Sequence, residues 1–155
     1  TGFLQRRAGL DALADALRDR RSGAAVGAVL YCDLDGFKTV NDAFGHEAGD
    51  LVLRTVADRV RRLVRDEDMV VRLGGDEFLV ALVGPVSDGT ALDVAEKLRL
   101  SVSEPVAVMG AQLEVGLSVG VVRPGADEGV DAVVARADTV MYRAKNEGRG
   151  RVVMA

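Results

Sequence analysis

The feature that most constrains this fold is the stretch MVVRLGGDEFLVALV, residues 69–83. Two short runs rich in Val and Leu flank the pair Gly74 and Gly75, and this pattern is typical of a β-hairpin with a tight turn. Two adjacent acids, Asp76 and Glu77, follow the glycines, and their carboxylates repel each other unless a positive charge lies nearby. The sequence therefore predicts a hairpin whose turn carries more charge than folding alone requires.

The rest of the chain alternates between helical and extended patterns. Leucines spaced three and four residues apart within residues 4–21 predict a first helix, which we expect Gly23 to end. We expect Gly148 to end the last helix, and Asp50 to lie near the start of the third, where a carboxylate suits the helix dipole. The expected helices span residues 4–21, 36–44, 49–64, 90–102 and 131–147. The expected strands span residues 25–32, 69–73, 77–83, 106–110, 111–122 and 151–154.

This order of elements predicts the fold class. Helices that alternate with hairpins and single strands favour an α/β (α+β) sandwich with a mostly antiparallel central sheet. The pattern fits the βαββαβ core of ferredoxin-like and polymerase-palm folds, flanked by helices. With 155 residues, of which 48% are hydrophobic, the chain is long enough for one packed core, so we expect residues 1–155 to form a single domain.

Composition and charge argue against several classes of partner. A net charge of -4 and 4% aromatic residues do not favour a nucleic-acid surface. The longest uncharged run, residues 22–32, falls short of the roughly 20 residues that span a bilayer, so we expect no direct membrane contact. The single cysteine, Cys32, fits a reducing cytoplasm. Because the sequence begins at Thr1 rather than Met, we expect a piece of a longer protein, which could be membrane-anchored elsewhere.

Acidic residues mark the candidate site. Asp33 and Asp35 follow the apolar run AVGAVLYC, at a strand end of the kind where α/β sheets usually bind ligands. If the hairpin neighbours this strand, Asp76 converges with Asp33, and a cation must offset their repulsion. Carboxylate oxygens favour Mg²⁺ or Mn²⁺, and the sequence has no His or Cys cluster that would favour zinc.

Three bases accompany these acids. Lys38 comes soon after the DLD acids, and Lys145 and Arg149 stand four residues apart at the end of the last predicted helix. A lysine supplies a point charge and an arginine a planar fork, so both can bind phosphates. Metal-binding acids beside isolated bases are typical of phosphoryl or nucleotidyl transfer, and the absence of a GxxxxGK(S/T) loop argues against a P-loop enzyme.

Several spaced motifs together resemble one family. GGDEF, residues 74–78, is the signature of the GGDEF domains, the diguanylate cyclases. TGFLQRR, residues 1–7, is similar to their opening TGLxNRR, and DLDGFKTVNDAFGHEAGD, residues 33–50, is similar to their block of DxDxFKxxND and GHxxGD. The ending ADTVMYRAKNEGRGRV, residues 137–152, resembles ADxxxYxAKxxGRN, with Gly150 where Asn is common. The resemblance covers essentially the whole chain.

The resemblance implies a diguanylate cyclase. Such enzymes act as homodimers in which each subunit holds one GTP. The 3′-hydroxyl of one GTP attacks the α-phosphorus of the other, twice, which gives cyclic di-GMP and two pyrophosphates. The resemblance also implies that Asp33, the Leu34 carbonyl and Asp76 hold Mg²⁺ (or Mn²⁺), two ions in each active half-site, and that Asp76 is the catalytic proton acceptor. A sensory or receiver domain N-terminal to the chain is the expected regulatory partner.

The same resemblance assigns the substrate contacts. Asn41 and Asp50 match guanine-recognition positions, and a carboxylate can accept both N–H donors of the guanine edge, which adenine lacks. His46 matches a position near the nucleotide, although a histidine at a helix start can equally bond to backbone. The apolar positions beside the base are Phe3 and Leu53, and the phosphate contacts are Lys38, Lys145 and Arg149.

RDED, residues 65–68, fits the RxxD motif at the family's spacing before GGDEF. In the family this motif is an inhibitory site, at which the product cyclic di-GMP binds. Arg65 can fork onto guanine or phosphate, and Asp68 can accept from the guanine edge. The plainer interpretation of the same four residues is a solvated helix end of mixed charge.

Some roles stay open at this level. Asp35 is expected to support the metal site rather than to bind the ion, and Glu77 either pairs with a base or only balances charge. Arg72 is expected to pair with acids beside the turn, and Tyr31 and Tyr142 are expected to pack. The alternative to an enzyme is a non-catalytic receptor of the same family that binds GTP or cyclic di-GMP, although the intact GGDEF motif favours the enzyme.

Overall fold

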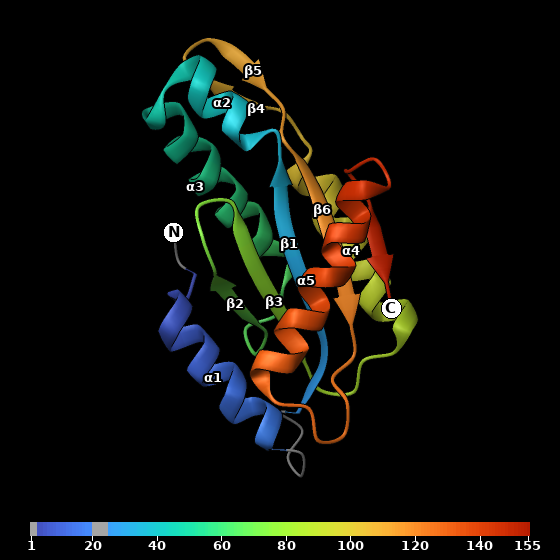
Figure 1. The fold of residues 1–155 in the computed structure, drawn as a ribbon. Coiled ribbons are helices and arrows are strands. Elements are labelled where there is room, and N and C mark those ends of the chain that lie inside the picture. The colour runs from blue at the N-terminus through green and yellow to red at the C-terminus, as the bar shows by residue number, and fades with distance from the viewer. Residues whose placement is uncertain (1–2, 20–24) are drawn as a thin grey trace.

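The computed structural model describes residues 3–19 and 25–155. Its helices are α1 (Arg6–Arg18), α2 (Phe37–Phe44), α3 (His46–Leu63), α4 (Asp88–Val102) and α5 (Val130–Asn146). Its strands are β1 (Val26–Asp35), β2 (Met69–Arg72), β3 (Glu77–Val83), β4 (Val106–Val108), β5 (Ala111–Leu113), β6 (Gly116–Val122) and β7 (Val152–Met154). In Figure 1 one sheet forms the middle layer, and helices cover both of its faces.

The sheet confirms the predicted fold class. Its five strands lie in the order β2-β3-β1-β6-β7, so the first strand of the chain is central and β3 of the hairpin lies beside it. β1 pairs antiparallel with both β3 and β6, and β2 pairs antiparallel with β3, whereas β7 runs parallel to β6. β4 and β5 form a separate two-stranded sheet. A mostly antiparallel sheet with helices on both faces is the expected α/β sandwich.

Two cores lie on opposite faces of the sheet, because β1 alternates its side chains with a period of two. Leu30, Cys32 and Leu34 share a core with α2, α3 and α4, whereas Val29 and Tyr31 share one with α1 and α5. The strand is buried along most of its length, which explains its nearly continuous apolar sequence. The same alternation sends successive residues at the end of the strand to different faces, and it thereby decides where the functional side chains lie.

Two predicted strands are wrong in their extent. β1 continues three residues past the predicted end at Cys32, so Asp33 and Asp35 belong to the strand instead of following it. The run 111–122 forms two strands rather than one, because the chain leaves the small sheet at the end of β5 and joins the main sheet at Gly116. Gly116 pairs there with Asp35, the last residue of β1. The two strands of this region therefore belong to different sheets, which a run of alternating apolar residues does not reveal.

The predicted start of α3 is also wrong. The helix begins at His46 rather than at residue 49, because Gly45, with φ 87°, ends α2 and directly precedes α3. A left-handed backbone of this kind favours glycine and reverses the chain without a linker. Asp50 therefore lies in the second turn of α3 instead of near its start.

The ends of the first and last helices follow the prediction in part. α1 begins two residues later than predicted, because Leu4 forms a parallel bridge with Val71 of β2. Gly23, predicted to end this helix, lies outside the described residues. α5 ends as predicted, just before Gly148, whose φ of 118° suits a glycine. No described helix has the length and apolar character that crossing a bilayer requires.

The packing of α5 on β6 provides a stability test. A Cβ at Gly120 would lie 2.2 Å from the backbone nitrogen of Met141 and 2.6 Å from the backbone oxygen of Ala137. We expect Gly120→Ala to force α5 away from the sheet and to lower the free energy of unfolding by about 3 kcal/mol. Gly89→Ala is the matched control, since a Cβ there meets only Ser87 Oγ, at 3.9 Å. Thermal unfolding should show a lower Tm for the first variant only, and equal Tm values would contradict this packing.

Candidate functional site

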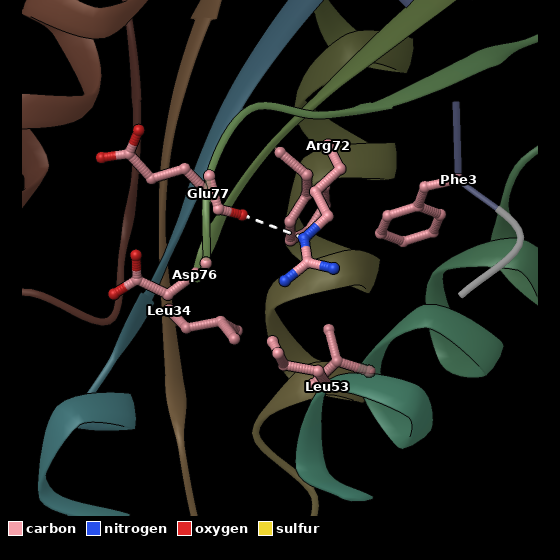
Figure 2. A pocket seen from close by; sticks show the side chains of 10 residues that line it. Phe3, Leu34, Leu53, Arg72, Asp76 and Glu77 are labelled. Atoms are coloured by element: carbon pink, nitrogen blue, oxygen red, sulfur yellow. Dashed lines mark hydrogen bonds between the residues drawn. The ribbon is translucent and has the colours of Figure 1, made fainter. Parts of the chain in front are cut away.

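Two cavities open on opposite faces of the sheet, at the carboxyl end of β1. The turn between β2 and β3 borders both of them. The apolar cavity lies on the side of α3 (Figure 2) and is lined beside that turn by Phe3, Leu34, Leu53, Val56 and Phe78. The acidic cavity lies on the side of α5 and is lined by Asp33, Asp76, Glu77 and Asp138, together with Lys145 and Arg149.

The structure brings the two predicted metal-binding acids together. Asp33 pairs with Glu77 across the β1–β3 ladder, and the Leu34 N–H donates to the backbone oxygen of Asp76 at 3.0 Å. Burial raises the pKa of Asp33 to about 6; the positive charge of Lys145 opposes this shift, and the negative charge of Asp76 adds to it. The acids therefore converge as the sequence predicts, and their convergence is unfavourable unless a cation compensates it.

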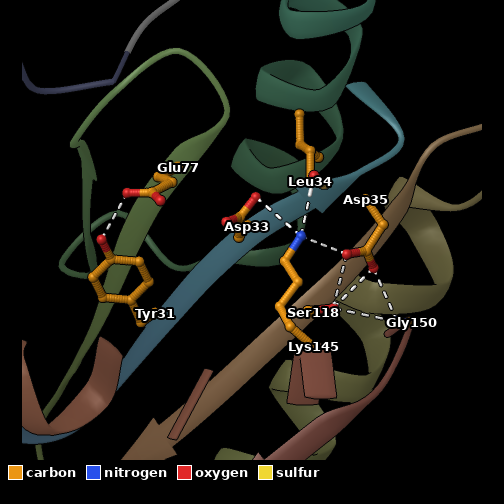
Figure 3. Close-up of polar contacts among 8 residues, drawn as sticks. All are labelled: Tyr31, Asp33, Leu34, Asp35, Glu77, Ser118, Lys145 and Gly150. Carbon is orange, nitrogen blue, oxygen red and sulfur yellow. Dashed lines mark hydrogen bonds and ion pairs between the residues drawn. The ribbon is translucent and has the colours of Figure 1, made fainter. Parts of the chain in front are cut away.

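Lys145 lies directly against these acids. Its Nζ is 2.6 Å from Asp35 Oδ1 and 3.3 Å from Asp33 Oδ1, and it donates to the Leu34 carbonyl at 3.5 Å (Figure 3). The sequence assigns Lys145 to a phosphate, whereas here its ammonium group lies among carboxylate and carbonyl oxygens of the kind that hold a hard divalent ion. This donor set fits Mg²⁺ or Mn²⁺. Within the described residues no three His, Cys, Asp or Glu side chains form a metal site alone, so substrate oxygens would have to complete the coordination.

Asp35 connects the end of β1 to the segment that follows α5. Its carboxylate accepts hydrogen bonds from Ser118 Oγ and from the Gly150 N–H, each at 2.9 Å, in addition to its contact with Lys145. Ser118 is fully buried, so the network is anchored in the sheet. Arg149 and Gly150 have φ of 64° and 56°, and Arg149 lines the acidic cavity. Because the oxygens of Asp35 are already engaged, the geometry agrees with a supporting role.

The glycine turn is held by backbone hydrogen bonds. The N–H groups of Leu73 and Gly74 both donate to the backbone oxygen of Glu77, at 3.0 and 3.3 Å. Arg72 donates from Nε to the Gly74 oxygen at 3.1 Å rather than to an acid, so its predicted pairing with acids is wrong. A Cβ at Gly74 or Gly75 would meet nothing within 4 Å. The chain's own packing thus leaves open space at both glycines, which suits the close approach of a ligand.

The predicted guanine contacts lie on α2 and on the first turns of α3. Asn41 is half-buried, and a Cβ at Gly49 would lie 1.8 Å from its Oδ1, so this glycine makes room for the amide. Lys38, His46 and Asp50 are exposed and lie outside the lining of both cavities. Asn41 also lies outside both linings, so neither cavity encloses the predicted guanine contacts.

The two apolar contacts predicted beside the base do line the apolar cavity. The ring of Phe3 lies 5.5 Å from the ring of Phe78, centroid to centroid, with an angle of 41° between their planes. Leu53 faces them from α3, and Leu34 closes the cavity from β1 (Figure 2). An apolar slot of this kind suits a flat ring.

Several side chains of the acidic cavity were not predicted from the sequence. They all lie on α5 and are Asp138, Met141, Tyr142 and Asn146. Their spacing of three and four residues from one another and from Lys145 places them on one face of the helix, and this periodicity could have revealed them. Tyr142 is 62% exposed, so its predicted packing is wrong. Tyr31 is buried as predicted, but its hydroxyl also donates to Glu77 Oε2 at 2.7 Å, so Glu77 pairs with a neutral group rather than with a base.

The RxxD residues form a closed loop after α3. The buried Asp68 carboxylate accepts the N–H of Arg65 at 2.9 Å and the N–H of Val83 at 3.0 Å. The Arg65 guanidinium pairs with Asp68 at 3.1 Å and with Glu67 at 3.2 Å, and it donates to the Val83 oxygen. Its side chain is nevertheless 56% exposed. Arg65 is therefore accessible to a ligand, whereas Asp68 is engaged within the chain.

Comparison with known proteins shows which family and which proteins this chain is similar to. A family profile described as "Diguanylate cyclase, GGDEF domain" matches residues 1–151. The chain belongs to the GGDEF family. This GGDEF chain is 42% identical over 139 residues to the bifunctional diguanylate cyclase/cyclic di-GMP phosphodiesterase MucR of Pseudomonas aeruginosa, which covers 89% of the chain and 20% of that protein. It is 40% identical over 129 residues to diguanylate cyclase A of Treponema denticola, which covers 82% of the chain and 34% of that protein. The chain thus spans only a fifth to about a third of these relatives.

Solved GGDEF domains have the same fold. The GGDEF domain of TpbB from Pseudomonas aeruginosa matches with a TM-score of 0.92 and 36% identity, over 100% of this chain and 91% of that one. The GGDEF domain of DgcB from Caulobacter crescentus, in complex with cyclic di-GMP, matches with a TM-score of 0.91 and 28% identity, over 99% of this chain and 92% of that one. Both likenesses confirm the predicted palm-like architecture.

The buried charge of Asp33 predicts a pH-dependent stability. Its pKa of about 6 exceeds that of the unfolded chain, so the folded state loses stability as the pH rises through about 6 and this carboxyl ionises. Without divalent ions, Asp33→Asn should raise the free energy of unfolding by about 1–2 kcal/mol at about pH 8, and the gain should vanish toward about pH 4. Asp58→Asn, at an exposed position on α3, is the control and should give no gain. Thermal unfolding measures both, and an equal gain for Asp33→Asn at the two pH values would contradict the assignment.

Proposed function

We propose that this chain is a diguanylate cyclase, which condenses two GTP into cyclic di-GMP and releases two pyrophosphates. The observation that carries this proposal is that the end of one strand borders an apolar cavity on one face and an acid–lysine cluster on the other. The apolar cavity suits the ring of a nucleobase, and the acid–lysine cluster suits phosphate oxygens together with a cation. Membership of the GGDEF family and the names of the relatives support the same reaction.

The acids of the cluster carry the chemistry in this proposal. Asp33, the Leu34 carbonyl and Asp76 would hold Mg²⁺ or Mn²⁺, two ions in each half-site. A bound ion would neutralise the triphosphate, polarise the α-phosphorus and lower the pKa of the attacking hydroxyl. Asp76 accepts the proton of the 3′-hydroxyl. The 3′-oxygen then bonds to the α-phosphorus of the other GTP, and the bond from that phosphorus to the pyrophosphate oxygen breaks. The phosphates of the substrate are bound by Lys38, Lys145 and Arg149.

The guanine is bound from α2 and α3. His46, Asp50 and Leu53 follow one another at intervals of four and three residues, so they lie on one face of α3. Because Leu53 lines the apolar cavity, Asp50 and His46 lie along its approach, and Asp50 can accept the donors of the guanine edge. Asn41 faces α3 across Gly49 and supplies a second polar contact to the base. Phe3 packs beside the ring.

Two subunits are needed in this proposal, since each holds one GTP and the two nucleotides react with each other. A regulatory domain is proposed N-terminal to the chain, because the curated relatives are much longer. The solved structure of diguanylate cyclase SiaD from Pseudomonas aeruginosa contains its activator SiaC. Control by a further protein is therefore also proposed for this chain. A cytoplasmic location is proposed from the free, buried Cys32.

Cyclic di-GMP is proposed as an inhibitor as well as the product. Its site is the RxxD loop, where the exposed Arg65 guanidinium contacts the ligand. Asp68 stabilises the loop, because its carboxylate accepts hydrogen bonds from two backbone N–H groups. The cyclic di-GMP in the DgcB structure supports binding of this ligand by GGDEF domains.

The activity assay tests the proposal directly. With GTP and Mg²⁺ the chain should form cyclic di-GMP and pyrophosphate, at a specific activity that rises with protein concentration as homodimers form. Asp76→Ala should lower the rate at least about 100-fold, because it removes both a metal ligand and the proton acceptor. Asp93→Ala, exposed on α4, is the matched control and should keep the rate. Chromatography of the nucleotides and light scattering measure these outcomes, and GTP binding without turnover would make the unmutated chain a receptor instead.

Product inhibition tests the RxxD site separately. Arg65→Ala should raise the cyclic di-GMP concentration that halves the rate by about 10-fold, because it removes a charge-assisted contact, and it should leave the initial rate unchanged. Arg62→Ala removes the same charge from an exposed position on α3 and should not change the inhibition. Asp68→Ala should instead lower the Tm, because it leaves two backbone N–H groups without an acceptor. Unchanged inhibition of Arg65→Ala in a product titration would rule out this site.

A further inference from the structure

Tyr31 lies two residues before Asp33 on β1. The alternation of the strand puts both residues on the same face, and the β1–β3 register puts Tyr31 opposite Leu79 and diagonally across from Glu77. The side chain is only 6% exposed and shares the core with α1 and α5. Its hydroxyl oxygen nevertheless reaches Glu77 Oε2 at 2.7 Å. The buried ring thus directs its single polar atom to the carboxylate of Glu77, the first residue of β3.

Within the described residues this contact is the only hydrogen bond of the Glu77 side chain. The surroundings of Glu77 are otherwise acidic: Asp76 precedes it, Asp33 pairs with it across the ladder, and Asp138 of α5 lines the same cavity. Burial and the negative charge of Glu77 together raise the pKa of Asp138. Ionised carboxylates repel one another, so Glu77 would turn away from this cluster if nothing held it.

The Tyr31 hydroxyl is well suited to hold the carboxylate. Burial, followed by the hydrogen bond to Glu77 and its negative charge, raises the pKa of Tyr31 far above the usual value, so the phenol keeps its proton. The packed ring has little freedom to move, so the position of the donor is fixed by the core. Figure 3 shows the Glu77 carboxylate between the Tyr31 hydroxyl and Asp33. The oxygen that Tyr31 does not bind, Oε1, remains available to the acidic cavity.

We propose that Tyr31 is a positioning residue for the reaction: its hydroxyl holds Glu77 by Oε2, so that Oε1 faces the acidic cavity beside Asp33. This inference rests on the proposed function, because Glu77 affects turnover only if the cavity binds the reacting groups. It gives Glu77 a defined place, which the sequence leaves open between pairing with a base and balancing charge. It also gives a catalytic consequence to a tyrosine that the sequence predicts only to pack.

A single hydroxyl deletion tests the positioning role. Tyr31→Phe should lower kcat by roughly 10- to 100-fold, the usual effect of losing a group that orients a site residue. The KM for GTP should change by less than about threefold, since the groups that bind the base and phosphates are unaltered. The matched control is Ser103→Ala, because Ser103 Oγ also donates a hydrogen bond of 2.7 Å, to the Arg99 oxygen at the end of α4. Both variants lose one hydrogen bond and some Tm, but only Tyr31→Phe should lose kcat.

A spectroscopic measurement tests the contact without turnover. The chain has two tyrosines and no tryptophan, so in a Tyr142→Phe background Tyr31 is the only tyrosine that absorbs in the near ultraviolet. Adding Glu77→Gln to this background replaces a charged acceptor with a neutral one. The Tyr31 absorption band should then shift to shorter wavelength, in the absence of nucleotide and divalent ions. Asp93→Asn in the same background is the control and should leave the band in place.

The possible results separate the inference from the proposed function. If Tyr31→Phe keeps the kcat of Ser103→Ala, or if the Tyr31 band does not respond to Glu77→Gln, the positioning role is overturned. If the unmutated dimer forms no cyclic di-GMP although the band responds, the proposed function fails, and the catalytic role of Tyr31 fails with it. A large loss of kcat together with a shifted band supports both.

Discussion

An ammonium group among acids is the interaction on which this site depends. Lys145 comes from the last helix, whereas Asp33 and Asp35 come from the first strand of the main sheet. The three side chains are 16%, 15% and 11% exposed, so removing the lysine would leave two poorly solvated carboxylates without a counter-charge. The packing of α5 on the sheet therefore also supplies the positive charge that balances the acids. The close approach of α5 to β6 at Gly120 is what allows the lysine to reach the acids.

The acids of the site do not stabilise the fold. Burial and neighbouring acids raise the pKa of Asp33, which means that the folded chain disfavours the very charge it carries near neutral pH. Natural proteins keep such destabilising groups where activity requires them. The surrounding cores are large and well buried, so the fold can tolerate this local cost. A hairpin turn does not require the two acids Asp76 and Glu77, whereas a binding site for a cation and phosphates does use such residues.

Much of this arrangement could be predicted from the sequence, because it follows from local patterns. The hairpin around Gly74 and Gly75, the strand that runs into Asp33, and the convergence of Asp33 with Asp76 all follow from strand ends that must meet in one sheet. Features that depend on register could not be predicted. The Tyr31–Glu77 bond requires knowing which residues of β1 and β3 face each other, and the burial of Asp68 depends on where β3 ends. The division of residues 111–122 depends on which sheet each half joins.

The alternation along β1 limits how this protein can change. From Ala28 onward, one row of side chains builds the apolar cavity and its core, and the other row carries the tyrosine and the acids. A substitution in this strand alters only one face of the sheet, and Leu34 and Asp33 are the β1 residues that line these two cavities. The insertion or deletion of a single residue would instead exchange the two rows, so that acids would enter an apolar core and leucines would face Lys145. The strand can therefore vary in chemistry from position to position, but its length is fixed.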